Sequence, residues 1–174
     1  MKISCMGCGY VGLVAGTCLA DMGNEVICFD IDKGKINKLE KGIIPIYEPG
    51  LKDMFERNIK EKRLHFSNGI KTAIKESNVI FITVGTPPGK NHEADLFAVK
   101  SVAEQIGRNM NTYKVIVNKS TVPVGTAELV KNIIKRNQTG EYEFDVVSNP
   151  EFLREGEAVK DFTNPDRIVI GTDS

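Results

Sequence analysis

Short apolar runs rich in β-branched residues alternate along the chain with longer segments whose apolar residues recur every three or four positions. The short runs predict strands, and the longer segments predict amphipathic helices. Strands that alternate with helices typically form a parallel sheet covered by helices on both faces. The sequence therefore predicts an α/β fold, a Rossmann-like doubly wound domain with a mainly parallel sheet.

The boundaries of these elements can be read from the same pattern. The expected strands are Lys2–Met6, Glu25–Phe29, Val79–Val84, Lys114–Asn118, Phe144–Val147 and Ile168–Ile170, with a short extended piece near Leu64–Phe66. The expected helices are Val11–Met22, Gly34–Lys41, Leu51–Lys60, Leu96–Met110 and Ala127–Arg136. An apolar stripe at helical spacing is expected to bury one face of the first helix, formed by Val11, Val14, Ala15, Cys18, Leu19 and Met22.

Three glycines, Gly7, Gly9 and Gly12, form a G-x-G-x-x-G pattern between the first strand and the first helix. In this pattern the first glycine permits a sharp turn, the second lets the backbone approach a pyrophosphate, and the third lets the helix pack close to the strand. Asp30 ends the second strand, where an acidic side chain accepts hydrogen bonds from an adenosine ribose. The sequence predicts a dinucleotide site, and Asp30 favours NAD because its carboxylate would repel the 2′-phosphate of NADP.

Two alternatives compete with this interpretation. Asp30 could instead be the N-cap of the helix that begins near Lys33. A methyltransferase can also carry a glycine turn and an acid on its second strand, but the tight glycine pattern leading directly into a helix disfavours that class.

Polar segments follow four of the predicted strands: Gly7–Gly12, Gly85–Gly89, Ser120–Thr126 and Asn149–Gly156. Ligands of open α/β sheets bind outside the carboxyl ends of the strands. Because parallel strands end at the same edge, we expect these four loops to form one cleft.

Candidate chemistry lies in the last two of these loops. Thr121 could bind the cofactor or a reacting water, or it could be a turn hydroxyl, whereas Thr126 is expected to begin the next helix. Glu151 and Glu155 are four residues apart, so a helical turn would place both carboxylates on one side. Close carboxylates raise each other's proton affinity, which suits acid–base catalysis. A solvated helix face is the alternative.

Composition removes several function classes. The 23 basic and 23 acidic residues cancel, so there is no electrostatic case for binding nucleic acid or an anionic membrane surface. No apolar stretch approaches the length of a membrane span, and the first residues lead into a strand rather than a signal peptide. We expect a cytoplasmic protein.

The cysteines and histidines give no metal site. Cys5 and Cys8 form a C-x-x-C, which is also typical of a redox pair or half a zinc site. No second C-x-x-C completes four ligands, so small buried hydrophobes are the better interpretation of all four cysteines. His65 and His92 are isolated and are expected at the surface.

Six ordered motifs make the whole chain resemble the amino-terminal domain of the UDP-glucose 6-dehydrogenase family. They are Gly7–Leu13, Pro45–Gly50, Val84–Pro88, Lys119–Thr126, Asn149–Gly156 and Asn164–Gly171. The resemblance implies a family that oxidises the C6 alcohol of UDP-glucose to a carboxylate in two hydride transfers, consuming two NAD⁺ and forming UDP-glucuronate for polysaccharide biosynthesis.

The resemblance also implies roles for individual residues. NAD would be bound by Gly7, Gly9, Tyr10, Val11, Gly12, Asp30, Lys35, Gly85, Thr86, Pro87, Ser120, Thr121 and Glu155. The sugar nucleotide would touch Glu151, Phe152, Leu153, Arg154 and Glu155, partly through backbone atoms. Catalysis would involve Thr121, Glu151 and Glu155. Glu151 would act in acid–base steps or position the hydrolytic water, with Thr121 beside that water.

The family also has catalytic residues outside its amino-terminal domain, and here the chain departs from the family pattern. The family's second oxidation uses a cysteine in a later domain, and a lysine and an asparagine on an intervening segment stabilise the oxyanion. None of these is present, so we expect residues 1–174 to be an NAD-binding domain without the central helix and the carboxy-terminal UDP-sugar domain. It should bind NAD, lack dehydrogenase activity alone and meet UDP-glucose mostly through the absent domain. The full-length protein would be a homodimer and this piece a monomer.

Two other functions fit many of the same residues. GDP-mannose 6-dehydrogenases share most of the motifs, although the wording of Gly85–Gly89 and Asn164–Arg167 favours the UDP-glucose branch. A stand-alone NAD-sensing module would explain the glycine turn and Asp30 equally well, but such a sensor has no need for Thr121 together with two carboxylates.

Overall fold

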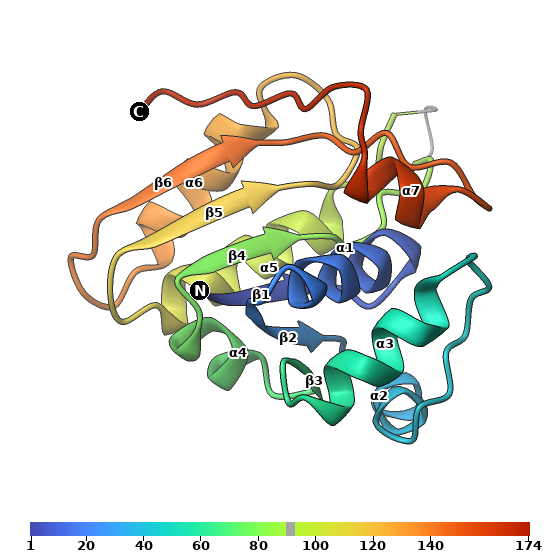
Figure 1. Cartoon of the computed structure of the whole chain (residues 1–174). Coiled ribbons are helices and arrows are strands. Elements are labelled where there is room, and N and C mark those ends of the chain that lie inside the picture. Colours follow the sequence, from blue (N-terminus) through green and yellow to red (C-terminus); the bar gives the residue numbers. More distant parts are fainter. Residues whose placement is uncertain (90–92) are drawn as a thin grey trace.

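The computed structural model describes residues 1–89 and 93–174 and contains a six-stranded sheet whose strands are all parallel. The strands are β1 (Lys2–Met6), β2 (Glu25–Phe29), β3 (Leu64–Ser67), β4 (Val79–Ile82), β5 (Lys114–Asn118) and β6 (Phe144–Ser148). Their order in the sheet is β3-β2-β1-β4-β5-β6 (Figure 1). The predicted α/β doubly wound sheet is therefore confirmed.

Helices cover both faces of this sheet (Figure 1). They are α1 (Tyr10–Asp21), α2 (Lys33–Glu40), α3 (Leu51–Lys60), α4 (Ile70–Glu76), α5 (Phe97–Asn109), α6 (Thr126–Asn137) and α7 (Ala158–Thr163). Helices α4, α5 and α6 pack on one face, and α1, α2 and α3 pack on the other. Helix α7 lies against the outer side of α1.

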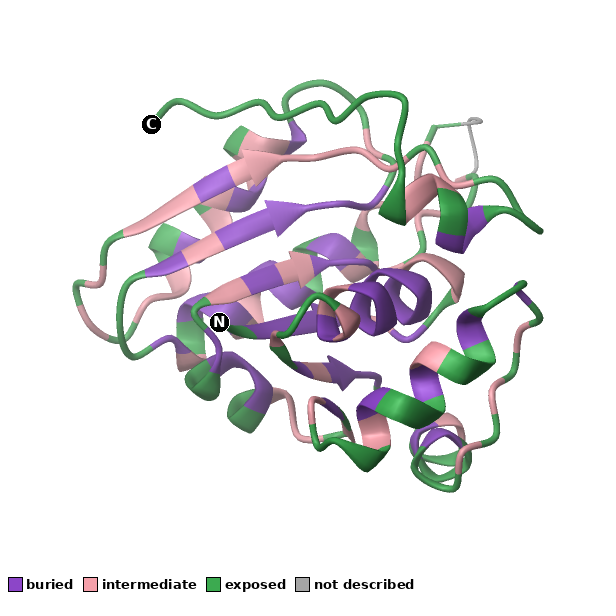
Figure 2. Ribbon diagram, in the orientation of Figure 1, coloured by how far each residue is buried: buried purple, intermediate pink, exposed green. Residues whose placement is uncertain are grey.

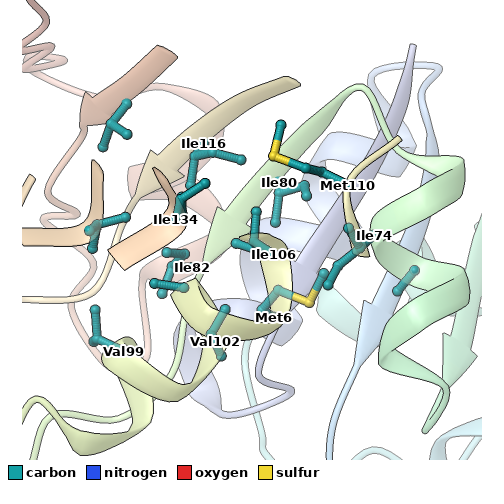
Figure 3. Packing of buried hydrophobic residues seen from close by; sticks show 14 of the residues in the cluster. Met6, Ile74, Ile80, Ile82, Val99, Val102, Ile106, Met110, Ile116 and Ile134 are labelled. Atoms are coloured by element: carbon teal, nitrogen blue, oxygen red, sulfur yellow. The ribbon is translucent and has the colours of Figure 1, made fainter. Parts of the chain in front are cut away.

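The apolar residues divide into a core on each face of the sheet. On the α4–α6 face, Met6, Ile80, Ile82 and Ile116 pack against Ile106 and other buried residues (Figure 3). On the opposite face, β1 and β2 contribute residues to a second core together with α1 and α3. Burial on both faces explains why these strands read as continuous apolar runs.

Helix α1 is buried more completely than the predicted stripe requires. Eight of its residues are buried, including Leu13 and Thr17, which lie outside the stripe. The reason is that α3 and α7 cover the side of α1 that faces away from the sheet (Figure 2). Met22, expected to face the core, is instead 57% exposed because it lies just beyond the end of the helix.

Other expectations about the elements were wrong or incomplete. Residues 168–170 do not form a strand; only Gly171 makes an isolated antiparallel bridge, to Ser148 at the end of β6. The short helices α4 and α7 were not predicted. His65 is exposed as expected, whereas His92 lies outside the described residues.

The strand order creates a switch point between β1 and β4. From β1 the chain proceeds to β2 and β3 on one side, and β4, β5 and β6 extend the sheet on the other. Doubly wound sheets bind dinucleotides in the crevice at such a point, beyond the carboxyl ends of the strands. The predicted loops after β1, β4, β5 and β6 all begin at this edge.

Candidate dinucleotide and sugar-nucleotide site

The glycine turn after β1 has no room for a side chain at two of its three glycines. Gly7 has φ +114°, and a Cβ there would lie 2.9 Å from the Thr83 carbonyl oxygen. A Cβ on Gly12 would lie 1.8 Å from the Gly7 carbonyl oxygen. A Cβ on Gly9 would meet nothing within 4 Å, so this position is open on its outer side. The turn fits a pyrophosphate lying over Gly9 at the start of α1.

Asp30 follows β2 and is turned toward this loop, with only 8% of its surface exposed. Its Oδ2 accepts hydrogen bonds from the Cys8 backbone N–H at 2.9 Å and from Lys35 Nζ at 2.8 Å. Its Oδ1 accepts one bond, from the Asp32 backbone N–H. Burial alone would raise the pKa of Asp30, but Lys35 and the two N–H groups hold that pKa below its ordinary value.

These contacts exclude one of the two interpretations of Asp30, the helix N-cap. The N-cap of α2 is Asp32, whose side chain accepts the Lys35 backbone N–H. Asp30 is therefore not the cap and stays ionised, with spare acceptor capacity on Oδ1 for a ribose hydroxyl. Lys35, named for NAD by the family resemblance, contacts the Asp30 carboxylate directly. The cradle and the acid together fit NAD.

The four predicted loops are tied to one another by hydrogen bonds. The Thr83 hydroxyl lies 3.0 Å from the Gly7 carbonyl oxygen, which connects β4 to the glycine turn. The Thr86 hydroxyl donates to the Thr121 carbonyl at 2.7 Å. Lys119 Nζ donates to Asn149 Oδ1 at 3.1 Å and so connects the last two loops. The loops thus lie together at one edge of the sheet, whereas a single cleft formed by all four stays a prediction.

Individual residues of the middle loops differ in how far they are available to a ligand. Ser120 is 7% exposed and its hydroxyl donates to the Val84 carbonyl at 2.7 Å, so its side chain supports the loops from within. Gly85, Pro87 and Thr121 are exposed at the edge of the sheet. Thr126 is the first residue of α6, as expected, and its hydroxyl donates to the Pro123 carbonyl.

The segment that carries Glu151 and Glu155 is not helical, contrary to our expectation. Residues 151–154 are irregular and 155–157 form a turn before α7. Glu151 accepts a hydrogen bond from the Leu153 backbone N–H at 2.5 Å, which folds its carboxylate back onto its own loop. Helical spacing therefore does not place the two carboxylates together. Glu155 is exposed, and Glu151 is half-buried.

Beside Glu151 lies a pocket of about 210 Å³ that also borders Phe152, Leu153 and Arg167. Lys119 projects into its wall with 7% of its surface exposed, and its ammonium lies 5.6 Å from the centre of the Phe162 ring. Burial lowers the pKa of Lys119, while the nearby Glu151 carboxylate opposes that shift. The pocket thus offers a buried cation, a carboxylate and apolar walls to a polar ligand.

Arg154 takes part in an ionic cluster rather than pointing into this pocket. Its guanidinium contacts Asp161 at 2.6 Å and Glu157 at 2.9 Å. The Arg154 guanidinium and backbone N–H lower the pKa of Asp161 to about 2. The cluster fixes the acidic segment against α7.

Sequence reasoning missed three residues at this edge. Ile31 follows Asp30 and is 85% exposed, an apolar surface next to the candidate ribose site. Glu48 and Lys119 are both buried polar residues. Ile31 lies beside a candidate residue, and Glu48 and Lys119 lie within motifs quoted for the family resemblance. A single sequence carries no sign that a charged side chain such as Glu48 or Lys119 is buried.

The cysteines, the possible metal ligands and the lengths of the helices can be compared with the expectations from the sequence. All four cysteines are buried free thiols, as expected. Among residues 1–89 and 93–174, no group of three His, Cys, Asp or Glu side chains is arranged to hold a metal ion. Within the same described residues, every helix is too short or too polar to span a bilayer.

The fold and the glycine cradle define a Rossmann-type dinucleotide-binding domain. Residues 1–174 match the family described as "UDP-glucose/GDP-mannose dehydrogenase family, NAD binding domain". The chain belongs to this family and comprises its NAD-binding domain.

Individual relatives agree with this assignment. The chain is 58% identical over 173 residues to the UDP-glucose 6-dehydrogenase TuaD of Bacillus subtilis, covering 99% of this chain and 38% of that protein. It is similar to a UDP-glucose dehydrogenase structure from Pyrobaculum islandicum, with a TM-score of 0.95 at 40% identity over 99% of this chain and 41% of that one. A GDP-mannose dehydrogenase ternary complex from Pseudomonas aeruginosa gives 0.94 at 39%, with the same coverage. The chain thus spans about two-fifths of the length of these relatives.

Proposed function

We propose that this chain is the NAD-binding part of a UDP-glucose 6-dehydrogenase, which oxidises the C6 alcohol of UDP-glucose to the carboxylate with two NAD⁺. The observation that carries the substrate is the 58% identity to the Bacillus subtilis UDP-glucose 6-dehydrogenase, against 39% to the GDP-mannose dehydrogenase structure. Because the chain covers 38% of the former protein, the remaining length would supply most of the sugar-nucleotide site.

The residues have distinct parts in this proposal. The turn Gly7–Gly12 and the start of α1 at Tyr10 and Val11 bind the pyrophosphate. Asp30 accepts from the adenosine ribose, and Lys35 keeps its carboxylate oriented. The loop edges at Gly85, Thr86, Pro87, Ser120, Thr121 and Glu155 lie along the other half of the dinucleotide. The bound cofactor supplies the hydride acceptor.

The acidic segment would meet the sugar. Glu151 and Lys119 line the same pocket, and in this proposal the Glu151 carboxylate acts in acid–base steps or positions the hydrolytic water. Leu153 contributes its backbone N–H to the Glu151 carboxylate and its side chain to the pocket. Phe152 gives the pocket an aromatic wall. The guanidinium and the backbone N–H of Arg154 are both bonded to Asp161, so Arg154 would meet the substrate through its backbone carbonyl oxygen.

Calorimetric titration of this chain with NAD⁺ and then UDP-glucose tests the proposal, with Asp30→Ala as the control. We expect NAD⁺ binding that Asp30→Ala abolishes, little binding of UDP-glucose and no steady NADH formation. Absence of NAD⁺ binding by the wild-type chain would refute the proposed cofactor site. Steady NADH production with UDP-glucose would refute the claim that catalysis needs further residues.

A further inference from the structure

The motif Pro45–Gly50 is not used by the proposed function, yet it carries one of the most enclosed carboxylates of the domain. Glu48 lies in the connection between α2 and α3 and is 4% exposed. Its Oε1 accepts a hydrogen bond from the Gly156 backbone N–H at 2.5 Å and another from the Tyr10 hydroxyl. Its Oε2 accepts the Ala158 backbone N–H at 3.1 Å. The carboxylate is therefore bound through both oxygens.

The charge of Glu48 is stabilised by hydrogen bonds alone. Within residues 1–89 and 93–174 no lysine or arginine forms an ion pair with it. Burial would raise the pKa of Glu48, but the Tyr10 hydroxyl and the two N–H groups hold that pKa below its ordinary value. Burial and the neighbouring Glu48 carboxylate raise the pKa of Tyr10, so its hydroxyl remains a donor. A buried carboxylate of this kind is costly unless each donor stays in place.

The three donors come from two parts of the site. Tyr10 is the first residue of α1 and follows Gly9 directly, where the pyrophosphate is proposed to lie. Gly156 and Ala158 close the segment that contains Glu151 and Glu155 and lead into α7. Glu48 thus joins the cofactor end of the site to the acidic segment. It is 38 residues from Tyr10 and 108 residues from Gly156 in the sequence.

We propose that Glu48 is a positioning residue that ties the acidic segment 151–158 to the start of α1 and so holds that segment in the conformation that meets the nicotinamide end of the bound cofactor. The inference rests on the proposed function, because it concerns the same cofactor and the same carboxylates. Because Glu48 fixes Gly156 and Ala158 against Tyr10, Glu155 is held beside the start of α1. An ordered start of α1 therefore favours the productive geometry of the acidic segment. By linkage, cofactor binding stabilises the acidic segment to the same extent.

Glu48→Gln is the decisive variant because it changes neither size nor shape. The two carboxylate oxygens accept from different backbone N–H groups. A carboxamide has one oxygen, so its NH₂ group must face either the Gly156 or the Ala158 N–H, donor against donor. Tyr10→Phe removes the third bond, together with the long contact of the same hydroxyl to the Arg154 carbonyl at 3.4 Å. Tyr47→Phe is the matched control because Tyr47 is the neighbouring tyrosine and is 86% exposed.

Two ligands separate positioning from general loss of structure. ADP-ribose contains the adenosine, the pyrophosphate and the second ribose, whereas NAD⁺ also carries the nicotinamide that would reach the acidic segment. We expect Glu48→Gln to weaken NAD⁺ binding by about tenfold, the order of one lost charge-assisted hydrogen bond. ADP-ribose binding should weaken by less than about threefold, and Tyr10→Phe should show the same ordering with a smaller effect. Equal losses for both ligands, or none for either, would overturn the coupling.

Amide hydrogen exchange provides a second test, whose first part requires no ligand. Glu48→Gln should speed exchange of the Gly156 and Ala158 amides at least about tenfold, while amides in β1 and β5 exchange as in the wild type. In the wild type, NAD⁺ should slow exchange across residues 151–158. Unchanged exchange at both amides would refute the role of Glu48 in holding Gly156 and Ala158.

If the wild type failed to bind NAD⁺, the proposed function and the coupling would both be refuted, and the exchange rates alone would decide whether Glu48 holds the two amides. If Glu48→Gln did not fold, the ligand comparison with Tyr10→Phe would decide the coupling.

Discussion

Alanine at Gly9 and alanine at Gly12 should both weaken NAD⁺ binding, but only alanine at Gly12 should also lower the stability of the fold, although both residues belong to one motif. At Gly12 the new Cβ would lie 1.8 Å from the Gly7 carbonyl oxygen and 2.7 Å from Thr83 Oγ1. At Gly9 the new Cβ meets nothing within 4 Å, and the backbone has φ −75° and ψ −168°, which alanine adopts freely. Gly12→Ala therefore disturbs the protein, and Gly9→Ala disturbs the ligand.

The magnitudes can be worked from these contacts. Overpacking against backbone costs up to about 3 kcal/mol of unfolding free energy, and alanine returns about 1 kcal/mol through its better helix propensity inside α1. The net loss for Gly12→Ala is about 2 kcal/mol, or roughly 4–8 °C in melting temperature for a domain of this size. For Gly9→Ala, the loss at the N-cap and the reduced entropy of the unfolded chain nearly cancel, so its stability should change by less than about 1 kcal/mol.

Thermal unfolding and NAD⁺ titration of the same preparations test this pair. Gly9→Ala should melt like the wild type yet bind NAD⁺ at least about tenfold more weakly, because its methyl group occupies the place of the pyrophosphate. Gly12→Ala should lose both stability and affinity. Wild-type affinity in Gly9→Ala would refute the placement of the phosphates, and a wild-type melting temperature in Gly12→Ala would refute the steric argument.

Two further predictions concern stability. Thr83→Val should lower the free energy of unfolding by about 1–2 kcal/mol because the Gly7 carbonyl loses the buried Thr83 hydroxyl; denaturant unfolding beside the exposed-site control Thr72→Val measures this, and equal midpoints would contradict it. Because the folded-state pKa of Asp161 is lowered to about 2, its contribution is complete above the unfolded pKa of about 3.9 and disappears as pH falls toward 2. Asp161→Asn should therefore be less stable than wild type at pH 6 and approach it near pH 2, and a constant difference across that range would exclude this ion pair as the cause.

Strong local patterns allowed much of the fold to be predicted. Strands β1, β2 and β5 and helix α3 have the predicted bounds, because buried parallel strands and an amphipathic helix leave clear apolar patterns. Helices α4 and α7 have seven and six residues, which is too short for helical periodicity to be distinct. The apolar run at residues 168–170 has strand propensity, but pairing with β6 is limited to the single bridge at Gly171. Propensity cannot supply a pairing partner.

The candidate site divides in the same way. Gly7, Gly9, Gly12 and Asp30 were identifiable because a sharp turn and a nearby acid are specified within about 20 residues of chain. The shared helical face of Glu151 and Glu155 was wrong, because the Leu153 N–H and the bonds to Glu48 replace a helical turn with an irregular loop. Their roles in catalysis stay predictions.

The sequence by itself determined most of the strands, the glycine turn and the family, because each of these depends on residues close together in the chain or on their order along it. Only the tertiary structure decided that Glu48 lies under the acidic segment, that Lys119 is buried beside Glu151 and that α1 is enclosed by α3 and α7. Each of those facts depends on segments that meet across the fold, and a buried charge is stable only where distant donors surround it.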